Sequence, residues 1–183
     1  MDLLTFQTDR LQLRRLTDHD YDLIIQTLPN KEIMDILNIG SAEQLALEKW
    51  KQQQGYATYN KKLLVFQLLD RQSLQNIGWC GYHNWYTDHC RAEIGYALTN
   101  QADRNKGLMS EALDRILAYG FEEMNLNRIE AFISPVNYAS QNLVKKFKFR
   151  KEGVLRGHYF KNGLLEDSFV YGLLKSDVTT YGN

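Results

Sequence analysis

The sequence predicts a mixed α/β domain of the α+β kind, in which helices flank a mostly antiparallel central sheet of about seven strands. Three observations predict this class. Short stretches with a two-residue apolar period dominate the middle and end of the chain, amphipathic helices interrupt them, and 183 residues suffice for one domain with a sizeable core. We therefore expect a single domain over residues 1–183.

Composition argues against several classes of protein. Hydrophobic residues make up 44% of the chain and charged residues 24%, which is close to the average for globular proteins. No apolar run approaches the roughly 20 residues that span a bilayer, and residues 1–10 carry no secretory signal. The 22 basic and 22 acidic residues balance, unlike those of a dedicated nucleic-acid binder. We expect a cytoplasmic protein with no membrane and no nucleic-acid partner.

The chain has no pattern typical of a metal site or a disulfide framework. Cys80 and Cys90 lack a short ligand spacing, and the four histidines form no metal motif. We expect reduced, buried thiols and no bound metal.

The first element is predicted to be a half-buried strand at residues 9–16, because Leu11 and Leu13 alternate with polar residues. A helix should begin directly after it, since Thr17 and Asp20 have the spacing of a capping box.

A polar, helical region is predicted from there to Tyr59. Pro29 and Gly40 interrupt it, and its longest helix is expected within residues 41–56. The polarity of this region indicates that it covers the core and does not form it.

Three strands are predicted in the middle of the chain, at residues 63–69, 76–86 and 91–98. The third should place alternate residues on opposite faces, with Glu93, Gly95 and Ala97 together on one of them. The second strand carries four aromatic residues, which we expect in the core and not on a nucleic-acid surface: Trp79, Tyr82, Trp85 and Tyr86.

The second half alternates helices with strands. An amphipathic helix is indicated by apolar residues at helical spacing: Met109, Ala112, Leu113, Ile116, Gly120, Phe121 and Met124. A strand at 127–134 and a helix from Asn137 follow, with Ala139, Leu143 and Phe147 expected to face inward. Two strands close the chain, at about 150–160 and 164–174, with residues 161–163 as a hairpin turn.

The stretch "NQADRNKGLMSEA" precedes the amphipathic helix and carries its clearest chemical motif. A helix amino terminus has unpartnered N–H groups and a partial positive charge, so it favours an anion. Gly107 can adopt positive φ and turn successive amides inward, while Arg104 and Lys106 add charge. The segment taken alone leaves a second interpretation open, in which Gly107 only shapes a turn and the basic pair is solvated.

The segments "AEIGYALTNQADRNKGLMSEAL", "NRIEAFISPVNYASQNLVKKFKF" and "RKEGVLRGHYFKNG" resemble the GNAT superfamily of N-acetyltransferases, and most closely its ribosomal-protein N-terminal (serine or alanine) acetyltransferase branch. The resemblance extends over about Thr8 to Lys175. It implies the GNAT fold, with a sheet splayed between the fourth and fifth predicted strands, and acetyl-coenzyme A (acetyl-CoA) as the cosubstrate.

The resemblance also implies which residues bind acetyl-CoA. The family's Q/R-x-x-G-x-G/A loop matches Arg104, Gly107 and Met109, where Met109 replaces the final glycine or alanine. A second departure is Lys148, which replaces a glycine usual in the family. The full set of implied contacts is Tyr96, Ala97, Leu98, Arg104, Asn105, Lys106, Gly107, Leu108, Met109, Ser110 and Asn137.

Two residues are candidates for proton transfer. Glu93 is the candidate base, or alternatively a structural carboxylate paired with Arg91 or Arg128. Many relatives use a tyrosine as the acid, but the matching position is Val144, so Ser140 is the candidate here.

Each remaining candidate has a structural alternative. The hydroxyl of Ser140 could instead bond within its own helix, and Asn137 could cap that helix as well as bind the cosubstrate. His158 and Tyr159 are expected to line the acceptor pocket, although His158 could be an ordinary surface residue.

The predicted reaction is acetyl transfer from acetyl-CoA to a primary amine, most plausibly the N-terminal α-amino group of a protein such as a ribosomal protein. Two alternatives remain: a small-molecule amine (amino acid, polyamine or antibiotic) as the acceptor, or a coenzyme A-binding module without turnover. A peptide acceptor predicts an open groove with few charges, whereas a polyamine predicts clustered carboxylates. A homodimer through the closing hairpin is a further possibility.

Overall fold

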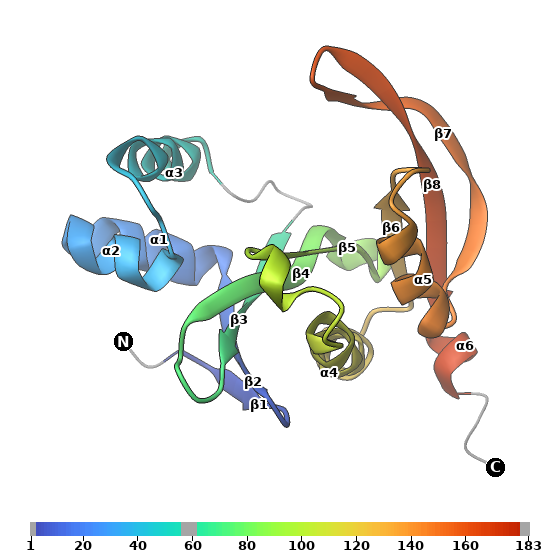
Figure 1. Cartoon of the computed structure of the whole chain (residues 1–183), viewed down its shortest axis with the longest axis horizontal. Coiled ribbons are helices and arrows are strands. Elements are labelled where there is room, and N and C mark those ends of the chain that lie inside the picture. Colours follow the sequence, from blue (N-terminus) through green and yellow to red (C-terminus); the bar gives the residue numbers. More distant parts are fainter. Residues whose placement is uncertain (1–2, 56–61, 180–183) are drawn as a thin grey trace.

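A computed structural model describes residues 3–55 and 62–179 and contains one eight-stranded sheet in the order β1-β2-β3-β4-β5-β6-β8-β7 (Figure 1). Neighbouring strands are antiparallel except for β5 and β6, which are parallel. The strands are β1 Thr5–Gln7, β2 Leu11–Thr17, β3 Lys62–Asp70, β4 Asn76–Tyr86, β5 Arg91–Leu98, β6 Arg128–Ile133, β7 Arg150–Lys161 and β8 Leu164–Leu174. The helices are α1 Asp18–Thr27, α2 Asn30–Leu37, α3 Ala42–Gln54, α4 Leu108–Glu122, α5 Tyr138–Lys146 and α6 Lys175–Thr179.

The predicted α/β class is confirmed, and the sheet has one strand more than expected. The additional strand is β1, which pairs with β2 over only three residues and is too short to show an alternating pattern. Thr17 and Asp20 form the predicted capping box at the start of α1. The helical prediction at Tyr59 lies outside the described residues.

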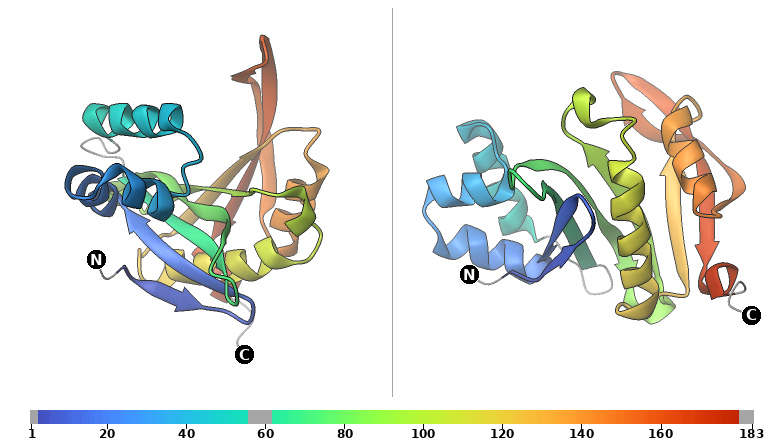
Figure 2. Two further views of the ribbon diagram at one scale, coloured as in Figure 1. Left: turned by 60° about the vertical axis from the view of Figure 1, so that its left-hand side comes forward. Right: turned by 60° about the horizontal axis from the view of Figure 1, so that its bottom comes forward.

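Helices cover both faces of the sheet (Figure 2). On β3, neighbouring side chains point to opposite faces of the sheet and so pack against different helices. The ring of Phe66 packs edge-on against Tyr119 of α4, with ring centroids 5.2 Å apart. The next side chain, Gln67, points the other way and donates a hydrogen bond of 2.8 Å to the carbonyl of Ile36 in α2. The larger core therefore lies between the sheet and α4, and a smaller one lies under α1–α3.

Helix α4 packs closely on β4, as its periodicity predicts. Ala112, Leu113 and Ile116 are fully buried, and the hydroxyl of Tyr82 donates to the Ile116 carbonyl at 2.7 Å. Gly120 permits this approach, since a Cβ there would lie 2.3 Å from the Tyr82 hydroxyl oxygen.

Strands β5 and β6 pair only from Arg91–Glu93 to Arg128–Glu130 and then separate. The splay expected between these strands is therefore present. Beyond Glu93, β5 keeps β4 on one edge and, among the described residues, no strand is paired to its other edge.

Two predictions about burial were wrong in part. In α5 the buried residues are Gln141 and Val144, whereas Ala139 is exposed. Gln141 is buried although polar because its amide donates to the carbonyl of Pro135 at 2.9 Å.

Both cysteines are free thiols, but only Cys80 is buried; Cys90 is half-buried in a turn.

The aromatic residues of β4 are divided between the core and the surface. Tyr82 is fully buried, while Trp79 remains 40% exposed on the opposite face of the strand. The prediction that this strand buries its aromatic residues is therefore correct for Tyr82 and wrong for Trp79.

Candidate active site

The loop before α4 has the backbone expected of an anion cradle. Gly107 is the N-cap of α4 with φ 78°, and no side chain caps the helix there. The first helical hydrogen bond runs from the Glu111 amide to the Gly107 carbonyl, so the amides of Leu108, Met109 and Ser110 have no partner within the helix. These amides and the helix dipole together favour a negatively charged group.

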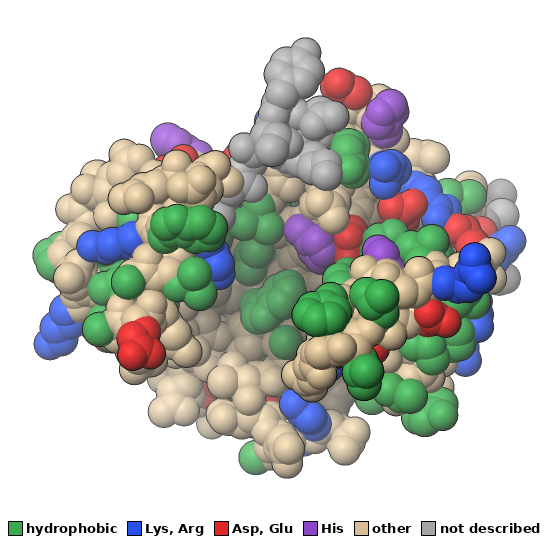
Figure 3. All heavy atoms as spheres, turned by 90° about the horizontal axis from the view of Figure 1, so that it is seen from above, with side chains coloured by type: hydrophobic (Ala, Val, Ile, Leu, Met, Phe, Trp, Pro, Cys, Tyr) green, Lys and Arg blue, Asp and Glu red, His purple; other side chains and the backbone are tan. Residues whose placement is uncertain are grey.

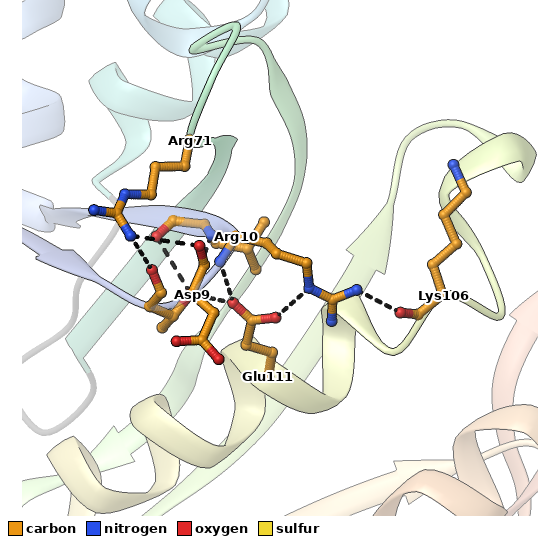
Figure 4. A network of polar contacts seen from close by, with 7 residues as sticks. Asp9, Arg10, Arg71, Lys106 and Glu111 are labelled. Carbon is orange, nitrogen blue, oxygen red and sulfur yellow. Dashed lines mark hydrogen bonds and ion pairs between the residues drawn. The ribbon is translucent and has the colours of Figure 1, made fainter.

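A bridge of polar contacts fixes this loop to the β1–β2 turn (Figure 4). The Nε of Arg10 lies 2.7 Å from the Oε2 of Glu111, and its Nη1 donates to the Lys106 carbonyl at 2.8 Å. Thr8 also donates to Glu111. Burial alone would raise the pKa of Glu111, but the hydrogen bonds from Thr8 and Arg10 outweigh it and lower that pKa.

A cavity of about 460 Å³, here called the loop cavity, lies between this loop, β5 and α5. Of the eleven residues predicted to contact acetyl-CoA, all except Lys106 line it, and so does Ser140. Lys106 instead faces a neighbouring polar groove and lies 3.6 Å from Asp103. The side chain of Met109 is only 9% exposed and belongs to the core, so this larger residue does not fill the cradle.

Asn137 and Ser140 meet at the start of α5. The Oδ1 of Asn137 accepts a hydrogen bond of 3.1 Å from the Ser140 amide, so the capping role of Asn137 is present while its side of the helix lines the loop cavity. In the described part of the chain, the Ser140 hydroxyl makes no hydrogen bond within its own helix.

Tyr96 also faces the loop cavity, and its hydroxyl is buried without a well-formed hydrogen bond among the described residues. Burial raises the pKa of Tyr96 to about 12, and the side chain of Ser140 acts in the opposite direction. At neutral pH this phenol is therefore protonated.

Glu93 lies at the point where β5 and β6 separate, and it is only 6% exposed. Its Oε1 lies 2.9 Å from the Nε2 of His83, and its Oε2 accepts a hydrogen bond of 2.9 Å from Asn84. Burial would raise the pKa of Glu93, but the hydrogen bonds from His83 and Asn84 prevail and lower it.

The proposed structural partners of Glu93 are thus incorrect. Arg91 and Arg128 both bind Glu130, at 2.9 Å and 2.8 Å, and Arg128 also binds Glu152. The sequence prediction missed His83, the actual partner, because no local motif marks it.

His158 and Tyr159 lie on β7 where its pairing with β8 shifts register, and both are close enough to Glu93 for electrostatic interaction. His158 helps to lower the pKa of Glu93; burial, and then the charge of Glu93, raises the pKa of Tyr159. The rings of His158 and Phe132 pack edge-on with centroids 5.0 Å apart. Neither His158 nor Tyr159 lines the loop cavity, and their predicted acceptor role remains a prediction.

A second cavity, here called the sheet cavity, has about 560 Å³ and lies where α1–α3 face β3 and β4. Figure 3 shows a hollow in the surface between the α1–α3 side of the molecule and the α5 side. The two cavities flank one pair of strands, because Trp79 of the sheet cavity is paired with Ala97 of the loop cavity. The lining of the sheet cavity is Tyr21, Leu37, Asn38, Glu48, Lys51, Leu63, Val65, Gln67, Asn76, Gly78, Trp79, Gly81, Tyr82, His83 and Thr99.

Residues 3–55 and 62–179 contain no cluster of three or more His, Cys, Asp or Glu side chains suited to a metal. The helices within those ranges are also too short or too polar to cross a membrane.

A sheet that splays at its parallel pair, with the open amino terminus of a helix beside the gap, is the architecture of an N-acetyltransferase. Residues 10–150 match the family model described as "Acetyltransferase (GNAT) domain". The chain belongs to this family, whose members use acetyl-CoA.

Relatives and solved structures agree with this assignment. The chain is 35% identical over 170 residues to the uncharacterized N-acetyltransferase YoaA of Bacillus subtilis (strain 168), covering 92% of this chain and 96% of YoaA. It is 30% identical over 115 residues to the ribosomal protein uS5-alanine N-acetyltransferase of Escherichia coli (strain K12), covering 62% and 59%.

Two crystal structures show the same fold. The ribosomal-protein-S5-alanine acetyltransferase of Vibrio fischeri gives a TM-score of 0.69 at 21% identity, over 95% of this chain and 98% of that one. The spermidine/spermine N-acetyltransferase SpeG of Vibrio cholerae gives a TM-score of 0.70 at 20% identity, again over 95% and 98%. The fold is thus shared by enzymes named for a protein acceptor and for a polyamine.

Proposed function

We propose that this enzyme acetylates the N-terminal α-amino group of a protein, such as a ribosomal protein. One observation carries the choice of acceptor: among the described residues that line the sheet cavity, Glu48 is the only carboxylate, and it is paired with Lys51 at 2.6 Å. Leu63, Val65 and Trp79 contribute apolar surface beside it. A cavity with a neutralised carboxylate and apolar walls suits a peptide end better than a polycation.

The loop cavity is the proposed site of acetyl-CoA. The amides that follow Gly107 would hold the pyrophosphate, because a positive-φ glycine has no Cβ to block them. The space at this position is otherwise open, since among the described residues a Cβ there would meet only the Arg10 side chain, at 3.5 Å. Arg104 and Lys106 would add charge, and Asn137 and the free edge of β5 would bind the pantetheine arm. Bound acetyl-CoA would supply an activated thioester, and the backbone of Tyr96–Leu98 would stabilise its carbonyl oxygen.

Two side chains serve the proton transfers, of which Ser140 lines the loop cavity and Glu93 does not. Glu93 supplies the negative charge needed to deprotonate the acceptor, and Ser140 is the hydroxyl available to protonate the leaving thiolate. Glu93→Gln should lower turnover at least tenfold and leave coenzyme A binding unchanged, since Glu93 does not line the loop cavity. Unchanged turnover in this variant would remove Glu93 from the reaction.

The competing acceptor is a polyamine, because the chain shares its fold with the spermidine/spermine N-acetyltransferase SpeG. A site for several ammonium groups needs unpaired carboxylates. The described lining of the sheet cavity contains one carboxylate, and Lys51 already neutralises it.

The test is acetyl-CoA turnover, measured by thiol release, with peptides that begin with free Ser or Ala, spermidine, amino acids and an aminoglycoside. We expect turnover with peptides and little with spermidine. Preferential turnover of spermidine would overturn the acceptor assignment and leave the reaction class intact. Tight coenzyme A binding without turnover on any acceptor would favour a binding module.

The cellular setting is proposed from the same features. The cytoplasm is where ribosomal proteins meet a soluble acetyltransferase, and no nucleic-acid or membrane partner is needed. The β7–β8 hairpin projects from the body (Figure 2) and exposes Phe160, Leu164 and Leu165 by 70% or more, which favours a homodimer. Sedimentation of the wild type and of Phe160→Ser tests this; a monomeric wild type contradicts it.

A further inference from the structure

His83 stands between Glu93 and the sheet cavity. Its side chain is 36% exposed and lines the cavity, whereas the side chain of Glu93 is 8% exposed and does not. An acceptor amine that enters the sheet cavity therefore meets the imidazole before the carboxylate.

The contacts of the pair determine which imidazole nitrogen is available. Both oxygens of Glu93 are already used, one by the Nε2 of His83 and the other by Asn84. An ionised carboxylate only accepts, so Nε2 carries the proton and, in the neutral imidazole, Nδ1 keeps its lone pair. Within residues 3–55 and 62–179, no hydrogen bond to His83 other than the one with Glu93 is found.

Gly95 forms the floor beneath this imidazole. Gly81 and Gly95 face each other across β4 and β5, and a Cβ on Gly95 would lie 2.9 Å from the Cε1 of His83 and 3.1 Å from the Cη2 of Trp79. The rings of His83 and Trp79 therefore lie directly over Gly95, and any larger residue at that position would displace them. The imidazole therefore forms part of the cavity wall.

We infer that His83 is the base that takes a proton from the acceptor ammonium, and that Glu93 is a positioning residue that orients the imidazole and balances its charge. This inference rests on the proposed function. Nδ1 takes one proton, and the freed nitrogen lone pair forms the N–C bond. The C–S bond breaks with its electron pair on sulfur; the second proton lost by nitrogen reaches sulfur through Ser140, and His83 releases its proton to water.

Besides Tyr82 of β4 itself, the charged and titratable groups that line the sheet cavity or interact with Glu93 come from four elements. Glu93 contacts it directly, the Glu48–Lys51 pair is internally neutralised, and the remaining groups are uncharged phenols or the second histidine. They are Tyr21 of α1, Glu48 and Lys51 of α3, Glu93 of β5, and His158 and Tyr159 of β7.

The experiment compares His83→Ala and His83→Gln with the matched control His89→Ala, which alters a histidine in the turn that follows β4. General bases contribute about 10²–10⁴ in rate. We expect both His83 variants to lower kcat at least 100-fold, to lose the acidic limb of the pH profile and to bind coenzyme A normally. Added imidazole should restore part of the turnover of His83→Ala and none of that of Glu93→Gln.

The double variant His83→Ala/Glu93→Gln should be hardly slower than His83→Ala, because Glu93 acts through the imidazole. If either His83 variant keeps the kcat and the pH profile of the wild type, the inference is overturned. Turnover by the wild type would still support the proposed function in that case. Absence of turnover by the wild type on every acceptor would instead overturn the proposed function. Retained coenzyme A binding shows that a slow variant is folded.

Discussion

Met109 shows how a residue can depart from a family motif while the backbone keeps its form. The family places glycine or alanine here, yet the side chain turns into the core and leaves the amide at the loop cavity. The motif position is therefore also a core position. Restoring the family residue should damage packing without improving the cradle.

Met109→Ala is expected to lower the free energy of unfolding by about 2–5 kcal/mol, because truncating a buried methionine leaves a cavity. Coenzyme A affinity should change by less than threefold. Urea denaturation and calorimetric titration measure the two quantities, with exposed Glu122→Ala on the same helix as the control. Unchanged stability would contradict burial of this side chain.

Glu111 acts on the loop through Arg10 and touches no proposed ligand atom. Its carboxylate accepts from the Arg10 backbone amide and side chain, both at 2.7 Å, while Arg10 in turn holds the Lys106 carbonyl. Hydrogen bonds to a charged group contribute about 1.5–3 kcal/mol each.

Glu111→Gln should therefore loosen the loop and weaken coenzyme A binding about tenfold, a difference of about 1.4 kcal/mol. Titration calorimetry measures the change, and Glu122→Gln removes the same charge from α4 without touching the bridge. Equal affinities in the two variants would show that the bridge does not position the loop.

At the scale of elements, the end of α5 explains the second departure from the family. Lys148 has φ 65°, and the turn closes with hydrogen bonds from the Phe149 amide to the Val144 carbonyl and from the Lys148 amide to the Lys145 carbonyl. This left-handed closure of a helix usually employs glycine. The left-handed backbone at this position thus favours the family's glycine, and Lys148 adopts the same conformation at a cost in Cβ strain.

Lys148→Gly is expected to raise the free energy of unfolding by about 0.5–1 kcal/mol, because glycine adopts positive φ without Cβ strain. Lys145→Gly, within α5, should lower it by a similar amount. Thermal unfolding of both variants distinguishes them. A lower midpoint for Lys148→Gly would mean that the lysine side chain stabilises the turn by more than its backbone strain.

The β4–β5 hairpin shows why the site could be predicted only in part. The ends of both strands follow from their periodicity and agree with the structure. Continuing the Tyr86–Arg91 pairing without a bulge would place Asn84 opposite Glu93, whereas a register shift at Asn84, which has φ 47°, brings His83 there. A one-residue shift moves a side chain to the other face, and no local pattern predicted this one.

At the scale of the whole molecule, the fold followed from local patterns, but the grouping of the site residues did not. Half of the residues that line the loop cavity lie within residues 103–110, and the family resemblance implies most of the others. The surroundings of Glu93 come from β4, β5 and β7, so only the strand order and two register shifts bring them together. Sequence periodicity contains no information about such distant pairings.

The fold also joins distant segments through carboxylates that must stay ionised. Glu93 is held by His83, Glu111 by Thr8 and Arg10, and Glu152 by Arg128. Burial opposes ionisation of all three, yet for each of these glutamates the pKa lies below the ordinary value of 4.5. The folded state therefore binds these protons less readily than the unfolded chain does.

The sign of the resulting pH dependence follows from this difference. Above about pH 4.5 the carboxylates are ionised in both states and their full stabilisation is present; as pH falls through the lowered values of the folded state, the unfolded chain binds more protons and that stabilisation is lost. We expect the urea midpoint to be nearly constant from pH 7 to about pH 5 and to fall below that. Glu111→Gln should show a lower midpoint at pH 7 and a shallower acidic decline, since it lacks one of the three groups. A decline as steep as that of the wild type would show that the bridge between the β1–β2 turn and α4 does not contribute to acid sensitivity.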